Sequence, residues 1–420
     1  MQLTGMRLQD VDLADNDRFL DDSPWRMFDV LRREDPVHWQ QEPSPNHGFW
    51  AVTRHEDIVR VLRDDATFSS EVGAVSLEEL DEEQLDTRRS MLETDGARHW
   101  ALRRLLQKDF TPKAVAHYGT FLRGLTASTL DAALPRGEFD FVKEISADFP
   151  IRVLARMLDV PDADTPQLIE WGNRMIGNTD PDYSDALVDS EDTEEYRLLP
   201  FRSPAALEVF DYGRDLAAAR RGVEAEDLVS KMINRVPEDG MALSDADFRN
   251  YFLLIVVAGN ETTRHAISHS MKALIEHPEA LDRLRADPSL LPVAIEEFLR
   301  WATPVHHFRR TAVVDVELRG KQIKAGDKVV VWFGSGNRDE DVFVDPYDFD
   351  VMRTPNDHVT FGKGGPHFCL GNALARLELR IMFEELLPRL SSIELAGDVE
   401  IMRSNFVHGI KKFPVRVTTT

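Results

Sequence analysis

Residues 361–371 constrain the fold more than any other part of this chain. They read FGKGGPHFCLG, so four glycines and one proline stand among eleven residues. Glycine favours backbone conformations that other residues avoid, and proline lacks a backbone N–H, which together exclude regular structure before Cys369. From Gly371 onward, apolar residues at helical spacing predict a helix. The only cysteine of the chain is therefore expected on a rigid turn at the start of a helix.

The position of Cys369 favours a metal ligand. Backbone N–H groups and the dipole at a helix N-terminus stabilise a thiolate. A lone cysteine more often packs as a small apolar side chain, but an inert core cysteine needs no glycine-rich turn. A cysteine nucleophile assisted by His367 is the other active interpretation. One cysteine excludes disulfides and any zinc or iron-sulfur site built from several protein thiolates, and it fits a reducing compartment.

The overall composition narrows the class of protein further. The 420 residues are 42% hydrophobic and 30% charged, which is typical of a globular protein with a large core. The formal net charge of −24 argues against a general binder of nucleic acids or anionic membranes. The N-terminus lacks the pattern of a signal peptide, and the most apolar stretch, Tyr251 to Ala258, is too short to span a bilayer. We expect a soluble cytoplasmic protein with a single domain over residues 1–420.

Helical patterns dominate, so the sequence predicts a mainly α fold with minor β-sheets. Two acidic stretches, Ser76 to Glu93 and Asp180 to Tyr196, are expected to be solvated helix faces or mobile loops. The expected helices run from Ala97 to Asp109, from Ser244 to just before Pro278, from Pro292 to Trp301 and onward from Cys369; the expected strands are Trp50 to Thr53, Ala312 to Leu318 and Lys328 to Phe333.

The long helix after Ser244 carries a polar interruption, Ala258-Gly259-Asn260-Glu261-Thr262-Thr263. Of these, Gly259 to Thr263 are poor helix formers or costly to bury, apart from the alkyl stem of the glutamate. A glycine there lets a flat ligand approach the backbone, and Thr262 can bond back to a carbonyl and open the helix. Glu261 beside it offers a source of protons. The alternative is a simple helix bend with a solvent-facing glutamate.

A third motif, Glu297-Phe298-Leu299-Arg300, places a carboxylate and a guanidinium three residues apart on one helix face. Such a pair contributes little when exposed. If buried, it is expected to be a structural clamp for another arginine or a backbone loop, with no part in catalysis.

Together, in this order along the chain, the three motifs resemble the cytochrome P450 family of haem-thiolate monooxygenases. The most specific resemblance is to the family signature F-x-x-G-x-x-x-C-x-G, with Phe361, Gly364, Cys369 and Gly371 taken as its fixed positions. The resemblance covers nearly the whole chain. It implies the family's fold, a triangular, prism-like helical domain with a small β-rich lobe.

The resemblance also assigns roles around haem b. Cys369 becomes the axial thiolate of the iron, within a haem-binding turn that includes Phe361, Gly362 and Gly371. Glu261 and Thr262 become the acid and alcohol pair that delivers protons to dioxygen, and Glu297 and Arg300 the structural clamp. The distal haem face falls to Ala258 and Gly259, and the propionates to His99, Arg103, Arg310 and His367, with Arg309 as the competing choice for Arg310.

The resemblance implies that one oxygen atom of O2 enters the substrate and that two electrons come from outside. The chain has no room for a fused flavin reductase and no cysteine cluster for an iron-sulfur centre, so a separate ferredoxin and ferredoxin reductase, fed by NAD(P)H, are the expected donors. A candidate docking patch is the basic stretch from Arg98 to Lys113, which is otherwise ordinary solvated surface; its positive residues are Arg98, Arg103, Arg104, Lys108 and Lys113.

Several stretches, including GFWAVTRHEDI and VVAGNETTRHAISH, look most like the actinobacterial subgroup that hydroxylates steroid side chains and methyl-branched or isoprenoid lipids. By that analogy the two acidic stretches form the lid of the pocket. The expected hydrophobic substrate is a steroid, terpenoid or branched lipid, and the pocket residues are Val75, Met175, Ile176, Val257, Val305, Phe308 and Phe406.

Three other classes remain open. The first is a peroxide-driven peroxygenase or a related haem protein that acts on a fatty acid or a natural-product intermediate. Such enzymes tend to lack the acid and alcohol pair, so Glu261 and Thr262 argue against this reading. The others are a non-catalytic haem or effector-binding protein and a cysteine hydrolase.

Overall fold

The computed structural model describes residues 5–44, 46–184 and 186–420, and most of their regular structure is helical. The helices are α1 Ser23–Glu34, α2 His55–Arg63, α3 Glu82–Arg88, α4 Gly96–Gln107, α5 Pro112–Val115, α6 Gly119–Ala133, α7 Asp148–Leu158, α8 Thr165–Ile176, α9 Ala205–Arg220, α10 Leu228–Asn234, α11 Asp245–Glu276, α12 Pro278–Ala286, α13 Leu291–Ala302, α14 Phe333–Gly336 and α15 Asn372–Leu386.

Short strands form a five-stranded sheet in the order β1-β2-β8-β5-β3, a three-stranded sheet in the order β4-β12-β9 and two hairpins, β6-β7 and β10-β11. The strands are β1 Val37–Gln40, β2 Phe49–Val52, β3 Phe68–Ser69, β4 Glu138–Asp140, β5 His307–Ala312, β6 Val316–Leu318, β7 Lys321–Ile323, β8 Lys328–Trp332, β9 Leu390–Leu395, β10 Glu400–Ile401, β11 Ile410–Lys412 and β12 Pro414–Thr419. The prediction of a mainly α fold with minor sheets is confirmed.

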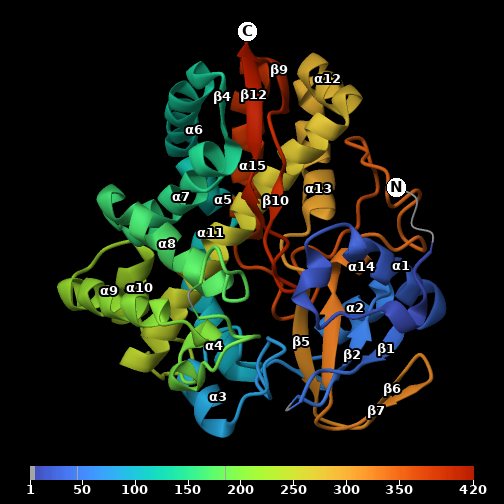
Figure 1. Ribbon diagram of the computed structural model, residues 1–420. Coiled ribbons are helices and arrows are strands. Elements are labelled where there is room, and N and C mark those ends of the chain that lie inside the picture. Colours follow the sequence, from blue (N-terminus) through green and yellow to red (C-terminus); the bar gives the residue numbers. More distant parts are fainter. Residues whose placement is uncertain (1–4, 45, 185) are drawn as a thin grey trace.

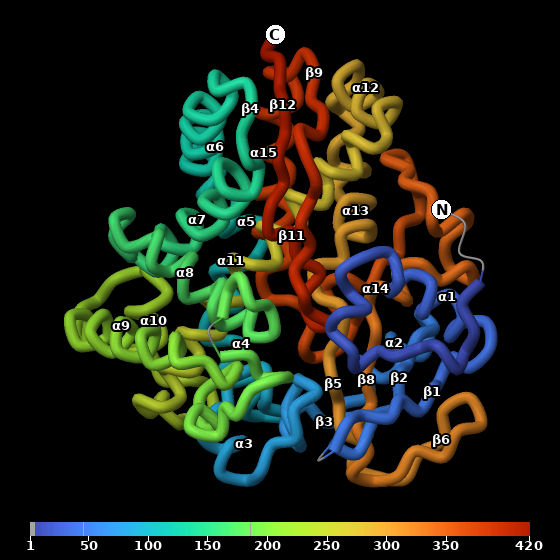
Figure 2. Tube along the Cα trace, viewed as in Figure 1, coloured from blue at the N-terminus to red at the C-terminus, as the bar shows by residue number. Residues whose placement is uncertain are grey.

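The helices gather around α11, and the five-stranded sheet lies to one side with α1 and α2 (Figure 1). α11 packs against α7, α8, α9 and α13. The tube view shows the same division, with the C-terminal strands, drawn in red, lying between the helical part and the part that contains the five-stranded sheet (Figure 2). One large apolar core fills the helical part, and two smaller apolar clusters lie around the five-stranded sheet.

Local sequence explains both ends of α11. The side chain of Ser244 accepts a hydrogen bond from the N–H of Asp247, whose carboxylate accepts from the N–H and the hydroxyl of Ser244 in return. At the other end the helix stops at His277, directly before Pro278, which supplies no N–H to continue it. The 32 residues between these ends form a rod of about 48 Å, so α11 crosses the whole helical part.

The other expected helices are confirmed, but the strand expected from Ala312 to Leu318 is wrong. Strand β5 ends at Ala312, and a new strand, β6, begins at Val316. Between them the N–H of Val313 donates to the carbonyl of Thr67, which turns the chain away from the sheet. Val313 and Val314 are exposed there, so an apolar run that looked like a buried strand is a surface turn.

The two acidic stretches lie against each other. The first contains α3, and the described residues of the second form turns and a short 3-10 helix, Glu194–Tyr196. Arg197 forms ion pairs with Asp81, at 2.9 Å, and with Glu83, and the amide of Gln84 donates to the carbonyl of Arg197 at 3.1 Å. These acidic residues are thus partners for arginine and not only solvated surface. Among the described residues, no helix is long and apolar enough to cross a membrane.

Glu378 of α15 is a buried glutamate that the fold leaves poorly satisfied. Its side chain contacts Thr263 of α11, and its Oε2 has no hydrogen-bond partner in the described part of the chain. Burial raises the pKa of Glu378 well above its usual value. Folding therefore favours the neutral, protonated form of this carboxyl group.

We predict that Glu378→Gln stabilises the protein at neutral pH. Because the pKa of Glu378 is raised on folding, the unfolded chain releases its proton first, so the wild-type free energy of unfolding falls as pH rises from about 4.3 toward the folded pKa. An amide does not titrate, so the advantage of the variant should grow with pH in urea titrations between about pH 5 and pH 8. The exposed Glu279→Gln is the control, and equal slopes in all three proteins would contradict the prediction.

Candidate functional site

The turn before α15 holds Cys369 through its backbone. The N–H of Cys369 donates to the carbonyl of Phe361 at 2.8 Å, and the amide of Asn372 donates to the carbonyl of Cys369, also at 2.8 Å. Gly371 is the N-cap of α15. The expected position of the cysteine, on a turn at the start of a helix, is confirmed.

The glycines of this turn correct one detail of the sequence reading. Four residues separate Gly364 from Cys369, one more than the signature allows, so the match at Phe361 and Gly364 is wrong by one position. Counted back from Cys369, the glycine of the signature falls on Gly365. A Cβ at Gly365 would lie 1.9 Å from the carbonyl oxygen of Leu62, so only glycine fits there. Gly364, with φ +70°, forms the turn that accommodates the additional residue.

Opposing effects act on the pKa of the Cys369 thiol. Burial raises the pKa of Cys369, while the N–H of Gly371, Arg103 and Arg376 act in the opposite direction. The expected stabilisation of a thiolate by the helix N-terminus is present, but burial outweighs it for the free thiol. A metal ion at this position would complete the deprotonation, because thiolate is the ligand form of cysteine.

The polar interruption in α11 keeps its helical form and exposes one strip of surface. Ala258 is exposed and Gly259 and Thr262 are partly exposed, although residues on either side are mostly buried. The hydroxyl of Thr262 donates to the carbonyl of Ala258 at 2.9 Å, as expected for a threonine in the middle of a helix. The strip thus places the small residues Ala258 and Gly259 beside the hydroxyl of Thr262.

Glu261 lies on a different side of α11 from Thr262. Its side chain is only 1% exposed, so the alternative of a solvent-facing glutamate is wrong. Its Oε1 accepts from the amide of Asn260 at 3.0 Å and from Arg264 at 3.2 Å. Burial acts to raise the pKa of Glu261, but Arg264 and His265 outweigh it and lower the pKa below its usual value.

Four cationic or imidazole side chains gather near the Cys369 turn. Arg103 of α4 donates to the carbonyl of Phe368 at 2.6 Å, and Nε2 of His99 lies 3.1 Å from the carbonyl of Pro366. The rings of His99 and His367 are 4.1 Å apart between centroids. Arg310 is buried, and burial lowers its pKa to about 10 against the opposing effects of Asp95 and Glu93. The structure therefore brings together His99, Arg103, Arg310 and His367.

Sequence reasoning missed Asp95, which organises this group. It accepts a hydrogen bond from the hydroxyl of Ser69 at 2.5 Å, and its Oδ1 lies 3.2 Å from Nε2 of His367. Burial acts to raise the pKa of Asp95, but these partners and the N–H of Glu71 outweigh it and lower the pKa to about 2. The signal in the sequence was an aspartate directly before a helix, which normally indicates a helix cap.

The structure also distinguishes Arg310 from Arg309, the competing choice for the same role. The side chain of Arg309 donates to the carbonyl of Glu78 at 2.8 Å and to Thr311, two residues along the same strand. Because side chains alternate along a strand, Arg310 points to the opposite side, where Asp95 and Glu93 lie. Arg310 is therefore the arginine that shares the site with His367.

Glu297 and Arg300 form a fully buried pair on α13. Two parallel hydrogen bonds of 2.7 Å join them, and both side chains are 0% exposed. Glu297 also accepts from Arg353, at 3.2 Å, and from Asn356, at 3.0 Å. Arg300 donates at 2.8 Å to the carbonyls of Asn337 and Pro346. The pair holds both an arginine and a backbone loop, as expected from the sequence.

We predict that Glu297→Ala costs about 3–5 kcal/mol of stability, because it leaves Arg300 as a buried charge without its partner. Urea unfolding and the haem content per mole of purified protein measure the loss. The exposed Arg283→Ala of α12 is the control and should stay within about 0.5 kcal/mol. A Glu297→Ala protein with normal stability and haem content would refute the clamp.

The expected pocket residues fall into two groups. Val305, Phe308 and Phe406 lie together, with 5.9 Å between the ring centroids of the two phenylalanines and a β-bridge between Val305 and Val407. Val75 is close by, since its carbonyl accepts from the N–H of Arg309. The second group is in the main core, where α8 packs on α11; it comprises Met175, Ile176 and Val257, all of them buried.

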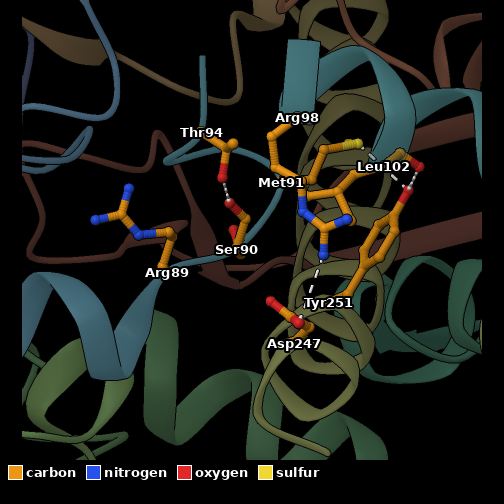
Figure 3. A pocket seen from close by; sticks show the side chains of 8 residues that line it. All are labelled: Arg89, Ser90, Met91, Thr94, Arg98, Leu102, Asp247 and Tyr251. Atoms are coloured by element: carbon orange, nitrogen blue, oxygen red, sulfur yellow. Dashed lines mark hydrogen bonds and ion pairs between the residues drawn. The ribbon is translucent and has the colours of Figure 1, made fainter. Parts of the chain in front are cut away.

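Two cavities lie near the site. One of about 30 Å³ separates α4 from α11 and has room for about two water molecules. In Figure 3, Tyr251 reaches the carbonyl of Leu102 and Arg98 points to Asp247 across this cavity. The other, of about 200 Å³, adjoins the Cys369 turn and is lined by Glu296, Asn356, Asp357, His358, Phe361, Gly362, Lys363, Phe368 and Arg376.

The basic stretch from Arg98 to Lys113 is largely neutralised within the chain. Arg98 pairs with Asp239 at 3.0 Å, and Arg104 pairs with Glu238 at 2.7 Å. Arg103 points to the Cys369 turn. Arg103, Lys108 and Lys113 have no ion-pair partner in the part of the chain that the structure describes, and of these three Arg103 is buried. The expected docking patch is thus reduced to these two lysines.

A cysteine on a rigid turn, a helix with an exposed polar break and converging cations define a haem-thiolate site. Comparisons with known proteins agree. The family model described as Cytochrome P450 matches residues 217–415. A methyl-branched lipid omega-hydroxylase of Mycobacterium tuberculosis is 37% identical over 397 residues, which cover 92% of this chain and 90% of that protein.

Two further comparisons cover still more of the chain. A steroid C26-monooxygenase of Mycolicibacterium smegmatis is 34% identical over 418 residues, which cover 97% of this chain and 94% of that protein. A Mycobacterium marinum cytochrome P450 in complex with pseudoionone superposes with a TM-score of 0.88 at 37% identity, over 98% of this chain and 99% of that one. This chain belongs to the cytochrome P450 family. It is a monooxygenase whose cofactor is thiolate-ligated haem b and whose co-substrate is O2.

The residues present fit this cofactor. Cys369 offers the only thiolate, and the strip at Ala258 and Gly259 offers a surface that a flat macrocycle can approach. The Nδ1 atom of His367 is buried without a hydrogen-bond partner among the described residues, and Arg310 is close enough to act on the ring. Such a group of donors suits the carboxylates that haem carries.

Proposed function

We propose that this enzyme hydroxylates an apolar lipid of the steroid, terpenoid or branched-chain class within one haem domain over residues 1–420. The observation that carries the proposal is the cluster of Val305, Phe308 and Phe406, an apolar and aromatic surface without a charged side chain among its members. A pocket with such a lining favours a hydrocarbon skeleton over a polar substrate. The names of the lipid and steroid hydroxylases among the relatives support the same class.

The proposed roles at the haem are those that the family resemblance implies, and the gathering of these side chains near the Cys369 turn supports them. Cys369 ligates the iron, and His99, Arg103, Arg310 and His367 hold the propionates. When bound, the thiolate-ligated haem activates dioxygen, so that one oxygen atom enters the substrate and the other leaves as water. Ala258 and Gly259, which are exposed or partly exposed on α11, form the surface that faces the ring in this proposal.

Glu261 and Thr262 serve proton delivery in this proposal. The hydroxyl of Thr262 lies on the exposed strip of α11, and the bond to the carbonyl of Ala258 fixes its orientation. Glu261 is the nearest residue in sequence with an ionisable side chain, buried behind that strip and paired with Arg264. The carboxylate supplies protons, and the hydroxyl passes them on.

Electrons come, in this proposal, from a separate ferredoxin and its NAD(P)H-dependent reductase. The protein has a single cysteine and therefore builds no iron-sulfur centre of its own. Lys108 and Lys113, next to α4, are the positive groups left for a weak electrostatic encounter with an acidic partner. The enzyme acts within the soluble, cytoplasmic pool of these carriers.

The alternatives are less well supported. A cysteine hydrolase needs a base at the thiol, but His367 faces Asp95 and the charged groups that act on Cys369 are Arg103 and Arg376. A peroxide-driven enzyme has no use for a proton-delivering pair, whereas this chain keeps both Glu261 and Thr262 at the break in α11.

We predict that sterols, terpenes or methyl-branched fatty acids shift the haem Soret band toward the high-spin form, because an apolar ligand displaces water from beside the iron. Titration of the haem-loaded protein with a panel of such lipids measures the shift. Phe308→Ala should weaken the response, since it removes an aromatic side chain from the apolar cluster. No response to any apolar lipid would contradict the proposed substrate class.

A control separates failure of the substrate proposal from failure to bind haem. The reduced, carbon monoxide-bound protein should show the absorption band that marks thiolate-ligated haem, and Cys369→Ser should abolish it. Colourless protein after haem supplementation would refute the whole site.

We also predict that Thr262→Ala keeps haem and substrate binding but releases reducing equivalents as peroxide. Loss of a positioned proton donor reduces the yield of product per electron by about tenfold or more. Product and peroxide per NAD(P)H consumed give the measurement. Thr262→Ser retains a hydroxyl and should restore most of the yield; equal yields in all three proteins would remove Thr262 from the relay.

A further inference from the structure

The carboxylate of Glu261 and the imidazole of His265 face each other inside the protein. They are one turn apart on α11, and their side chains are 1% and 0% exposed. Nε2 of His265 lies 3.4 Å from Oε2 of Glu261, and neither atom has a hydrogen-bond partner among the described residues. Because an unsatisfied buried polar atom is costly, each of these atoms depends on the other.

The backbone fixes the tautomer of His265. The N–H of Ile410 donates to Nδ1 of the ring at 3.3 Å. A backbone N–H can only donate, so Nδ1 must carry a lone pair. Burial and the charge of Arg264 lower the pKa of His265, which keeps the ring neutral. The remaining proton of a neutral ring is then on Nε2, which points at Glu261.

The ring has little freedom to leave this position. A Cβ at Gly409 would lie 3.0 Å from both Cε1 and Nε2 of His265, so the backbone there approaches the ring as closely as glycine permits. The turn that contains Gly409 and Ile410 thus holds the ring from the side opposite to α11. His265 is fixed from two elements.

This contact holds the acid away from the hydroxyl. The other oxygen of Glu261 faces α8, where a Cβ at Gly172 would lie only 3.0 Å from Oε1. Thr262 lies on the exposed strip of α11, on another side of the helix. For Glu261 to serve Thr262, its carboxylate must turn or pass its proton through water. The donors on Glu261 therefore determine how readily the carboxylate moves.

We propose that His265 is a positioning residue for Glu261, whose Nε2–H retains Oε2 in the withdrawn position between α11 and α8. The inference rests on the proposed function of Glu261 in proton delivery. His265 remains neutral and transfers no proton. Asn260 and Arg264 hold Oε1, so His265 is the one side chain among the described residues that acts on Oε2.

The tautomer is the direct test. Protein labelled with ¹⁵N-histidine, in the diamagnetic carbon monoxide-bound state, gives separate signals for Nδ1 and Nε2, and His265→Gln assigns them. We expect a protonated Nε2 and an unprotonated Nδ1. A proton on Nδ1, or a doubly protonated ring, would overturn the proposal.

The second test is coupling. His265→Leu should lower the peroxide formed per NAD(P)H about threefold, because the carboxylate freed from one polar contact can turn toward Thr262, with the substrate Kd unchanged. His265→Gln keeps an N–H donor and should return the peroxide yield toward wild type. His269→Leu is the matched control, because His269 is one turn further along α11 and contacts the carbonyl of His408 instead of Glu261. Equal yields in the Leu and Gln variants would refute positioning.

The two tests distinguish this inference from the proposed function. The tautomer is measured without substrate or redox partner, so it is expected even if no lipid binds. A protein that hydroxylates lipid but carries the proton on Nδ1 would retain the proposed function and lose the role of His265.

Discussion

The buried ion pair of Glu297 and Arg300 supports the haem-ligand turn through a chain of hydrogen bonds. Arg300 donates to the carbonyl of Asn337, whose side chain accepts from the N–H of Val359 and donates to the hydroxyl of Thr360 at 2.8 Å. Phe361 directly follows Thr360, and its carbonyl accepts from the N–H of Cys369. A charge pair on α13 therefore fixes the backbone position of the metal ligand, because each member of the chain is satisfied by the next.

The sequence predicted the elements whose signals are local. The Ser244 cap, the proline after α11 and the glycine-rich turn before Cys369 all act within a few residues, and each is where the sequence placed it. The strand break after Ala312 was missed because it depends on a hydrogen bond from Val313 to Thr67, far away in the chain. The error of one residue in the signature could be corrected from the sequence by counting back from Cys369, whereas the reason for glycine at position 365, the carbonyl of Leu62, comes only from the structure.

At the site too, the sequence indicated local features better than contacts between distant segments. Local motifs identified Cys369, Glu261 and Thr262, but the partners that set their properties come from other elements or looked unremarkable in the sequence. Neither Asp95, which lies at His367, nor His265, whose Nδ1 accepts from the N–H of Ile410, was singled out from the sequence. The charge of −24 likewise hid how many carboxylates are engaged with arginines inside the fold, as the neutralised stretch around Arg98 shows.

The close contact between Gly365 and the carbonyl of Leu62 has a mechanical consequence. Leu62 belongs to α2, beside the five-stranded sheet, whereas Asn372 and the rest of α15 belong to the helical part. The Cys369 turn is thus braced by both halves of the molecule. Motions that open the protein for a large substrate cannot separate the two halves at this contact without also moving Cys369, the iron ligand. The two acidic stretches are joined differently, through Arg197, which pairs with Asp81 and Glu83 of the first stretch and with Glu194 of the second, so ionic strength can loosen this contact.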